Sequence, residues 1–249
     1  EAPAYNICTQ EDWQTDVPVF TLSGKLRQAR LMGEELVLSR TIQTSYGRDG
    51  FTLSDVVRNE GDAVTPLMVL YHMNFGYPLL APESELFCPT AAIVARSPFA
   101  AEGVAEYSAF HAPVRGIEER VYFHTLMPDS AGITGAALYN PTLDLGAAIT
   151  FPAAQFPCFT QWKMMGVRDY VLGLEPGCAN PIGQSAAREK NVLATLAPDE
   201  ERAFTIDYTI LHDSWDVVGL KGTGSKDVVI DGAFVPDHHM HKFSDGFKQ

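Results

Sequence analysis

The sequence lacks the features that would take a protein into a membrane or out of the cell. A membrane-spanning helix needs roughly 20 consecutive apolar residues, and no apolar run among the 249 residues approaches that length. The first four residues, EAPA, have neither the basic start nor the apolar centre of a signal peptide. We therefore predict a cytoplasmic protein with no membrane partner.

Positive charge is also scarce. Eighteen Lys and Arg residues face 31 Asp and Glu residues, which gives a formal net charge of -13. A surface of this sign repels the phosphates of nucleic acids and of anionic lipids, so we expect no nucleic-acid partner. Uncharged small molecules such as sugars are not repelled, and they stay open as ligands.

Cysteine is infrequent and scattered. Cys8, Cys88, Cys158 and Cys178 form no Cys-x-x-Cys pair of the kind that holds zinc or supports redox chemistry. We expect buried or inert thiols in a reducing compartment. His238, His239 and His241 lie close together near the chain end, but we interpret them as solvated side chains and predict no native metal site.

Windows with a helical pattern are few, and 184–190 is the best short one. The chain consists mostly of short apolar or alternating segments, separated by Gly, Pro, Asn and Asp. The segments that we expect to be strands are 17–22, 35–44, 51–59, 65–74, 103–110, 120–126, 135–139, 145–151, 158–164, 170–175, 191–196 and 203–211. This pattern predicts an all-β protein, most simply a large antiparallel sandwich.

Two polar residues stand out because each lies at the end of an apolar segment. His72 follows the apolar run 67–70 and is surrounded by aromatics, and Glu175 ends the apolar run 170–174. A histidine and a glutamate on separate strands can flank a small polar substrate, one donating a proton while the other accepts one. Such chemistry needs no cofactor, and we predict none. The competing interpretation is structural, with His72 as a core histidine and Glu175 as a strand-end residue before Pro176.

Four sequence blocks, in this order, resemble the aldose-1-epimerase-like branch of the galactose mutarotase superfamily over about residues 17–211. The blocks are VFTLSGKLRQAR (19–30), LYHMNFGYPLL (70–80), TQWKMM (160–165) and GLEPG (173–177), which is followed by Arg188 and Glu189. The resemblance implies a β-supersandwich with a sugar site. It also implies that His72 protonates the ring oxygen of the sugar and that Glu175 removes the proton of the anomeric hydroxyl.

Further polar residues are candidates for binding a small-molecule sugar. Asn74 lies beside His72 in the same block, and Gln161 and Lys163 alternate with Trp162 along one strand. Side chains that alternate along a strand point to opposite faces. We therefore expect Gln161 and Lys163 to share a face turned away from the indole, and toward sugar hydroxyls. His124 is a further candidate, with an ordinary core role as the alternative.

The sequence departs from this family at both ends. The matched part corresponds to a supersandwich that lacks its N-terminal strands, which in mutarotases carry another histidine and an arginine. From about residue 213, GLKGTGSKD (219–227) and FVP (234–236) resemble instead the middle β-domain of acyl-CoA dehydrogenase-like, flavin-dependent hydroxylases. We therefore divide the chain into a mutarotase-like sandwich at 1–212 and a foreign-looking tail at 213–249.

Three hypotheses about function follow from these residues. The first is an aldose mutarotase or epimerase that interconverts sugar anomers by acid-base catalysis at His72 and Glu175. The alternative is a carbohydrate-binding β-sandwich without catalytic activity. A fragment of a flavin enzyme is the third, and it depends on the tail alone.

Overall fold

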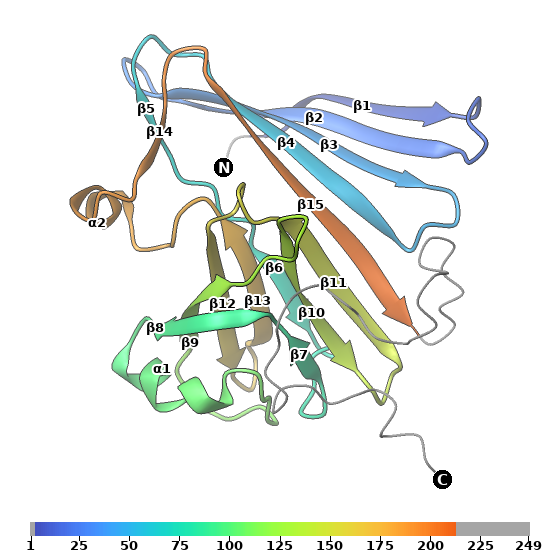
Figure 1. Cartoon of the computed structure of the whole chain (residues 1–249), viewed down its shortest axis with the longest axis vertical. Helices are drawn as coiled ribbons and strands as arrows, with labels where there is room; N and C mark the ends of the chain where they lie inside the picture. Colours follow the sequence, from blue (N-terminus) through green and yellow to red (C-terminus); the bar gives the residue numbers. More distant parts are fainter. Residues whose placement is uncertain (1–2, 213–249) are drawn as a thin grey trace.

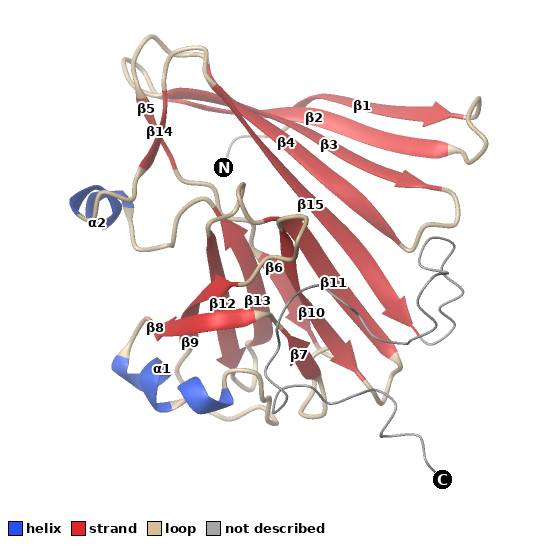
Figure 2. Ribbon diagram, viewed as in Figure 1, coloured by secondary structure: helices blue, strands red, loops and turns tan. Residues whose placement is uncertain are grey.

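The structure is a computed structural model that describes residues 3–212, and these residues form an antiparallel β architecture with little helix (Figures 1 and 2). The strands are β1 Tyr5–Asp12, β2 Val19–Ala29, β3 Glu35–Ser45, β4 Gly50–Asn59, β5 Thr65–Leu67, β6 Met73–Gly76, β7 Glu85–Phe87, β8 Thr90–Ala95, β9 Arg120–Leu126, β10 Ile133–Asn140, β11 Leu145–Pro152, β12 Cys158–Met165, β13 Tyr170–Gly177, β14 Ala194–Leu196 and β15 Glu201–His212. The helices are α1 Pro98–Glu102, a 3₁₀ turn at Val104–Glu106 and α2 Gln184–Glu189. The predicted all-β class is confirmed. The tail from residue 213, with its three histidines, lies outside the described residues.

Two sheets pack face to face around the hydrophobic core. The larger sheet has the strand order β1-β2-β3-β4-β15-β11-β10-β7, and the smaller one has the order β6-β13-β12-β9-β8. A short ribbon of β14 and β5 lies beside them. In Figure 1, β1 and β2 run along the top, away from the smaller sheet, and every residue of β1 is exposed. The core therefore lies under the other half of the large sheet, where β15, β11 and β10 face the smaller sheet.

The alternation of side chains along β4 shows how the sequence builds this core. Leu53, Asp55, Val57 and Asn59 are buried, while the intervening residues are more exposed. A strand that covers a core from one side has this period of two. The alternation therefore also brings one carboxylate, Asp55, to the core face of the sheet.

Asp55 is compensated by two partners. Its side chain is fully buried and accepts hydrogen bonds from Arg40 Nε at 2.9 Å and Arg40 Nη2 at 2.7 Å. It also accepts one from the Tyr71 hydroxyl at 2.7 Å. The ring of Tyr71 packs against Phe156 and Phe204 in the core. Because Tyr71 precedes β6 of the smaller sheet, this network ties the two sheets together.

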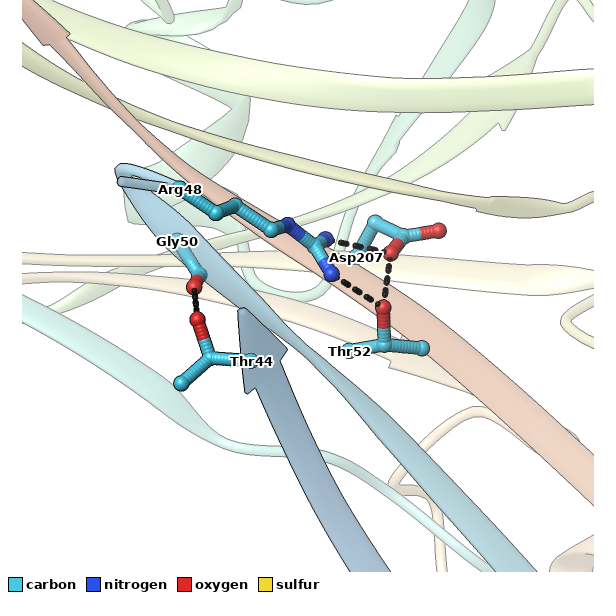
Figure 3. A network of polar contacts seen from close by, with 5 residues as sticks. All are labelled: Thr44, Arg48, Gly50, Thr52 and Asp207. Carbon is cyan, nitrogen blue, oxygen red and sulfur yellow. Dashed lines mark hydrogen bonds and ion pairs between the residues drawn. The ribbon is translucent and has the colours of Figure 1, made fainter. Parts of the chain in front are cut away.

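A second polar network fixes the turn between β3 and β4 (Figure 3). Arg48 donates to Thr52 Oγ1 at 2.8 Å and to Asp207 Oδ1 at 2.9 Å, and the Thr52 hydroxyl donates to the same carboxylate at 2.6 Å. The Thr44 hydroxyl bonds the Gly50 carbonyl at 2.6 Å across the turn. These contacts attach the hairpin to β15, a strand that follows about 150 residues later.

The structure corrects two of the predicted segments and adds strands that were missed. The expected strand at 103–110 is wrong, because α1 ends at this point and a 3₁₀ turn follows. Ser97 caps helix α1 by accepting a hydrogen bond from the Ala100 N–H, and Pro98 occupies the first turn. The expected strand at 65–74 is divided into β5 and β6, and strands β1, β7 and β8 were not predicted.

The Tyr71–Asp55 bond generates a stability prediction. Tyr71→Phe keeps the ring packing but leaves a buried carboxylate with one donor fewer, and hydrogen bonds to charged groups contribute roughly 1.5–3 kcal/mol. We expect the free energy of unfolding in a denaturant titration to fall by about that amount. Tyr46→Phe is the control, because the Tyr46 side chain is 74% exposed and should contribute nothing measurable. Equal stability of the two variants would contradict a structural role for the network.

Candidate active site

The candidate site is built on the pairing of β6 with β13. The antiparallel pairing continues on the N-terminal side of β6. The Tyr71 N–H donates to the Pro176 carbonyl at 2.9 Å, and Leu70 forms an isolated bridge with Gly177. This register leaves His72 directly opposite Glu175. Directly opposite residues of an antiparallel pair project to the same face of the sheet. Two residues that are 103 positions apart in the sequence are thus brought together by backbone pairing.

The two side chains contact each other but differ in their exposure to solvent. His72 Nε2 lies 3.0 Å from Glu175 Oε1, and the side chains are 44% and 3% exposed, respectively. Among the described residues no donor is aligned to make a regular hydrogen bond to that Glu175 oxygen. Glu175 is thus a buried carboxylate in contact with an imidazole that solvent can reach.

Burial raises the pKa of Glu175 above its ordinary value of 4.5. The charges of His72 and Arg96 act in the opposite direction, and the charge of Glu119 adds to the increase. Desolvation disfavours the ionised carboxylate more than the neighbouring positive groups favour it. A carboxylate in this condition binds a proton more readily than a solvated glutamate does, which suits a general base.

Gly173 provides the space that Glu175 occupies. A Cβ atom at position 173 would lie 2.5 Å from Glu175 Oε1, 3.1 Å from Trp162 Cβ and 3.3 Å from His72 Cε1. The carboxylate therefore leans over Gly173, where any other residue would displace it. Glycine is required at this position for a close approach of side chains, and the backbone conformation is that of an ordinary strand.

Trp162 and Asn74 complete this face of the site. Both lie opposite Gly173, Trp162 on β12 and Asn74 on β6. The indole ring packs edge to face on His72, with ring centroids 5.3 Å apart. Asn74 is exposed, so its amide is available beside the pair. Of the predicted site residues, the structure brings together His72, Glu175 and Asn74.

The other predicted binding residues lie on the opposite face of the smaller sheet. Gln161, Lys163 and His124 are 0%, 4% and 5% exposed. Lys163 Nζ donates to the carbonyls of Glu106, Tyr107 and Ala109. Gln161 bonds the Tyr107 carbonyl at 2.9 Å and lies 3.1 Å from His124 Nε2. As expected from alternation along β12, Gln161 and Lys163 point to the face opposite Trp162. That face turns toward the segment that follows α1 and away from His72.

Burial has the expected electrostatic effect on these side chains. It lowers the pKa of His124 to about 4, against a smaller opposing effect of the hydrogen bond with Gln161. It also lowers the pKa of Lys163 to about 8, and the nearby Arg120 adds to the decrease. The polar atoms of these residues are already bonded within the protein, so they support the fold around 104–110.

Two residues that received no role from the sequence lie near the pair. Arg96 follows β8 and Glu119 precedes β9, and they form an ion pair with each other. Glu119 Oε2 accepts a hydrogen bond from Trp162 Nε1 at 2.7 Å. Both residues lie in segments that flank strands, where sequence periodicity gives no signal. The block TQWKMM that contains Trp162 was the one available indication.

The remaining sequence expectations concern cysteines, metals and membranes. All four cysteines are free thiols, and Cys8 is exposed rather than buried. Burial raises the pKa of the Cys178 thiol, as expected of an inert cysteine. Within residues 3–212 no group of three His, Cys, Asp or Glu side chains is arranged to hold a metal ion. No helix in that range has the length and hydrophobicity to cross a membrane.

The strand architecture is that of a galactose mutarotase-like β-sandwich. The structure of a candidate aldose 1-epimerase from Klebsiella pneumoniae aligns with a TM-score of 0.81 and 26% identity, over 86% of this chain and 56% of that one. A galactose mutarotase-like protein from Clostridium acetobutylicum aligns with a TM-score of 0.56 and 13% identity, over 83% and 66% of the two chains. The second likeness shows the fold alone. The chain thus spans little more than half the length of the Klebsiella protein.

The chain belongs to the family described as "Domain of unknown function (DUF4432)", whose model matches residues 1–210. A further match is short. It is 62% identical over 34 residues to a pigment production hydroxylase from Rhodococcus erythropolis, which is 14% of this chain and 9% of that protein. The assignment of residues 213–249 to a hydroxylase-like segment stays a prediction.

The raised pKa of Glu175 predicts a pH-dependent effect of Glu175→Gln on stability. Because the folded protein favours the protonated carboxyl, its contribution to stability is present at low pH and is lost as the pH rises through the pKa of the folded state. The Gln variant should therefore melt a few degrees higher than the parent at pH 7, and the difference should vanish below pH 4.5, the ordinary pKa. Thermal melting at both pH values measures this. The control Glu118→Gln changes an exposed residue and should leave the melting temperature unchanged at both pH values. A Glu175→Gln variant that melts below the parent at pH 7 would refute the argument.

The close approach at Gly173 predicts that Gly173→Ala displaces the carboxylate. The added methyl group should separate Glu175 from His72 and cost roughly 1–3 kcal/mol of stability, as overpacking of a tight site does. The NMR signals of the His72 ring should move toward their positions in Glu175→Gln. Gly76→Ala is the matched control, because a Cβ there would meet nothing closer than 3.7 Å. Unchanged His72 signals in Gly173→Ala would show that the carboxylate does not need this space.

Proposed function

We propose that the protein interconverts the anomers of an aldose by proton transfer at His72 and Glu175. The observation that carries this proposal is the contact between an accessible imidazole and a buried carboxylate, 3.0 Å apart, on one face of a mutarotase-like sheet. The likeness to the candidate aldose 1-epimerase of Klebsiella pneumoniae supports the same class of substrate. The role of each residue follows from its chemistry.

In the proposed reaction, Glu175 removes the proton from the hydroxyl on C1 of the cyclic sugar, and His72 donates a proton to the ring oxygen. The bond between C1 and the ring oxygen breaks, and C1 becomes an aldehyde carbon. After rotation about the bond from C1 to C2, the ring oxygen attacks the other side of the aldehyde. As the ring closes, His72 takes back the proton of the attacking hydroxyl and Glu175 returns its proton to the aldehyde oxygen, so both residues are regenerated without a cofactor.

The short distance between the two residues suits this reaction. The hydroxyl oxygen and the ring oxygen are bonded to the same carbon, so the base and the acid must act on neighbouring atoms. A protonated His72 beside an ionised Glu175 is the state in which the cycle begins. Positioned acids and bases contribute roughly 10²- to 10⁴-fold each, which is sufficient for a reaction that proceeds slowly in water.

Replacement of the two residues tests the proposal. Glu175→Gln removes the proton acceptor and His72→Asn removes the proton donor, so each should slow anomer exchange by at least ~10²-fold, or ~2.7 kcal/mol. The double variant should be little slower than either single one, because residues that act as a unit are not additive. NMR magnetisation transfer between the anomers of glucose and galactose measures the exchange rate.

The controls separate catalysis from binding and from folding. His111→Asn and Glu118→Gln change the same residue types outside the site and should leave exchange unchanged. Saturation-transfer NMR should show that the active-site variants still bind sugar. Near-normal exchange in both single variants would place the chemistry elsewhere. A parent protein that binds sugars without exchanging anomers would instead be a carbohydrate-binding sandwich, and a flavin absorbance spectrum in the purified protein would revive the flavin-enzyme hypothesis.

A further inference from the structure

A fixed indole ring stands next to the His72–Glu175 pair. Trp162 Nε1 donates to Glu119 Oε2 at 2.7 Å, and the other oxygen of Glu119 accepts from Arg96. The indole is thereby held from its polar end, while its ring system packs edge to face on His72. An aromatic ring in such a position offers an apolar surface whose orientation does not need to be fixed when a ligand binds.

The charged groups around this ring are paired with one another. Arg96 and Glu119 form an ion pair, so the positive charge of the guanidinium is largely cancelled where a substrate would lie. His72 is in contact with the carboxylate of Glu175, and the protein as a whole has a net charge of -13. A substrate with a phosphate or a carboxylate would add a further negative charge without meeting an unpaired cation among these side chains. Like charges placed together in this manner exclude a ligand.

We propose that Trp162 is the stacking platform for the apolar face of an uncharged aldose, and that the Glu119–Arg96 ion pair holds the platform and excludes anionic sugars. This proposal rests on the proposed function, since it names the substrate class of the same site. Cyclic aldoses carry their C–H groups largely on the faces of the ring and their hydroxyls around its edge. A sugar stacked on Trp162 therefore directs edge oxygens toward the neighbouring His72 and Glu175, with the exposed Asn74 amide beside them.

The two parts of the ion pair have different tasks in this arrangement. Glu119 binds the indole N–H directly, so Glu119 is a positioning residue for the platform. Arg96 donates to the other oxygen of Glu119. This ion pair neutralises the guanidinium charge that would otherwise attract a phosphate. Removal of the Glu119 charge should therefore both loosen the indole and uncover the guanidinium.

The first experiment tests the platform. Trp162→Ala should raise the KM for glucose or galactose about tenfold, the usual cost of truncating an aromatic anchor, while kcat changes much less because His72 and Glu175 remain. Tyr46→Ala removes an aromatic side chain that is 74% exposed and distant in the fold, and it should change neither constant. An unchanged KM in Trp162→Ala, in a protein that exchanges anomers, would overturn the platform and leave the proposed function standing.

Fluorescence gives a readout that does not depend on catalysis. The chain has three tryptophans, Trp13, Trp162 and Trp215, so Trp13→Phe with Trp215→Phe leaves Trp162 as the single emitter. We expect glucose or galactose to change its emission in a saturable manner, and a phosphorylated aldose to do so with at least about tenfold weaker affinity. A protein that shows no anomer exchange but retains this response contradicts the proposed function alone. No response to either neutral sugar at saturating concentration contradicts the platform.

The second experiment tests the charge balance. Glu119→Gln removes one negative charge and one of the two oxygen acceptors, and it leaves Arg96 without a counter-charge. The preference for glucose over glucose 6-phosphate, measured by the same fluorescence titration, should fall about tenfold in this variant. Glu118→Gln removes an equal charge at the adjacent residue and should leave the preference unchanged. A parent protein that binds the phosphorylated sugar as tightly as glucose would overturn the proposed exclusion.

Discussion

The candidate site depends on one constraint, the backbone register that continues from β6 through Tyr71 against β13. A shift of one residue in this register would send His72 to the opposite face of the sheet, because side chains alternate along a strand. Tyr71 prevents such a shift from two directions. Its N–H is bonded to the Pro176 carbonyl, and its hydroxyl is bonded to Asp55 of the larger sheet. The position of His72 is therefore fixed by the packing of the two sheets as well as by strand pairing.

Two carboxylates of this region, Asp55 and Glu175, are buried, and they differ in the hydrogen bonds that they accept. Asp55 accepts three hydrogen bonds, two from Arg40 and one from Tyr71, so it is satisfied and its role is structural. Glu175 has an ion-pair contact with a side chain that solvent can reach, and one of its oxygens has no aligned donor among the described residues. A buried polar group without a regular partner costs stability. Glu175 carries this cost, and perturbed carboxylates of this kind are common at functional sites.

The sequence was informative about what lies within one strand and less so about what lies between strands. The period-two pattern identified most of the strands, and the position of His72 and Glu175 at the ends of apolar runs identified the pair. The same parity argument separated Gln161 and Lys163 from Trp162 correctly. It could not tell which face of β12 turns toward His72, because that depends on the pairing partners of the strand. Polar residues that fasten 104–110 to the sheet were thus taken for residues that bind a ligand.

Other errors have equally physical origins. The edge strand β7 contains only three residues, too few to establish a period, so it escaped prediction. The segment 103–110 has an apolar pattern suited to a strand, but Ser97 and Pro98 start a helix directly before it, and the turn continues into that segment. Arg96 and Glu119 gave no signal at all, since their importance arises from a contact between two strand-flanking segments.

The division of the site between strands and flanking segments has a consequence for its specificity. His72 lies 3.0 Å from Glu175, and a Cβ atom added at Gly173 would lie within 3.5 Å of both side chains. A side chain introduced at Gly173 would therefore disturb the pair. Arg96 and Glu119 lie outside the strands, are about 40% exposed, and contact the strands through Trp162 and a backbone bond. Substitutions in these segments can alter the charge beside the indole without moving the acid or the base. In the proposed function, strand register therefore fixes the positions of the acid and the base, while the ion pair at the edge of the sheet sets the charge beside the indole and also acts on the pKa of Glu175.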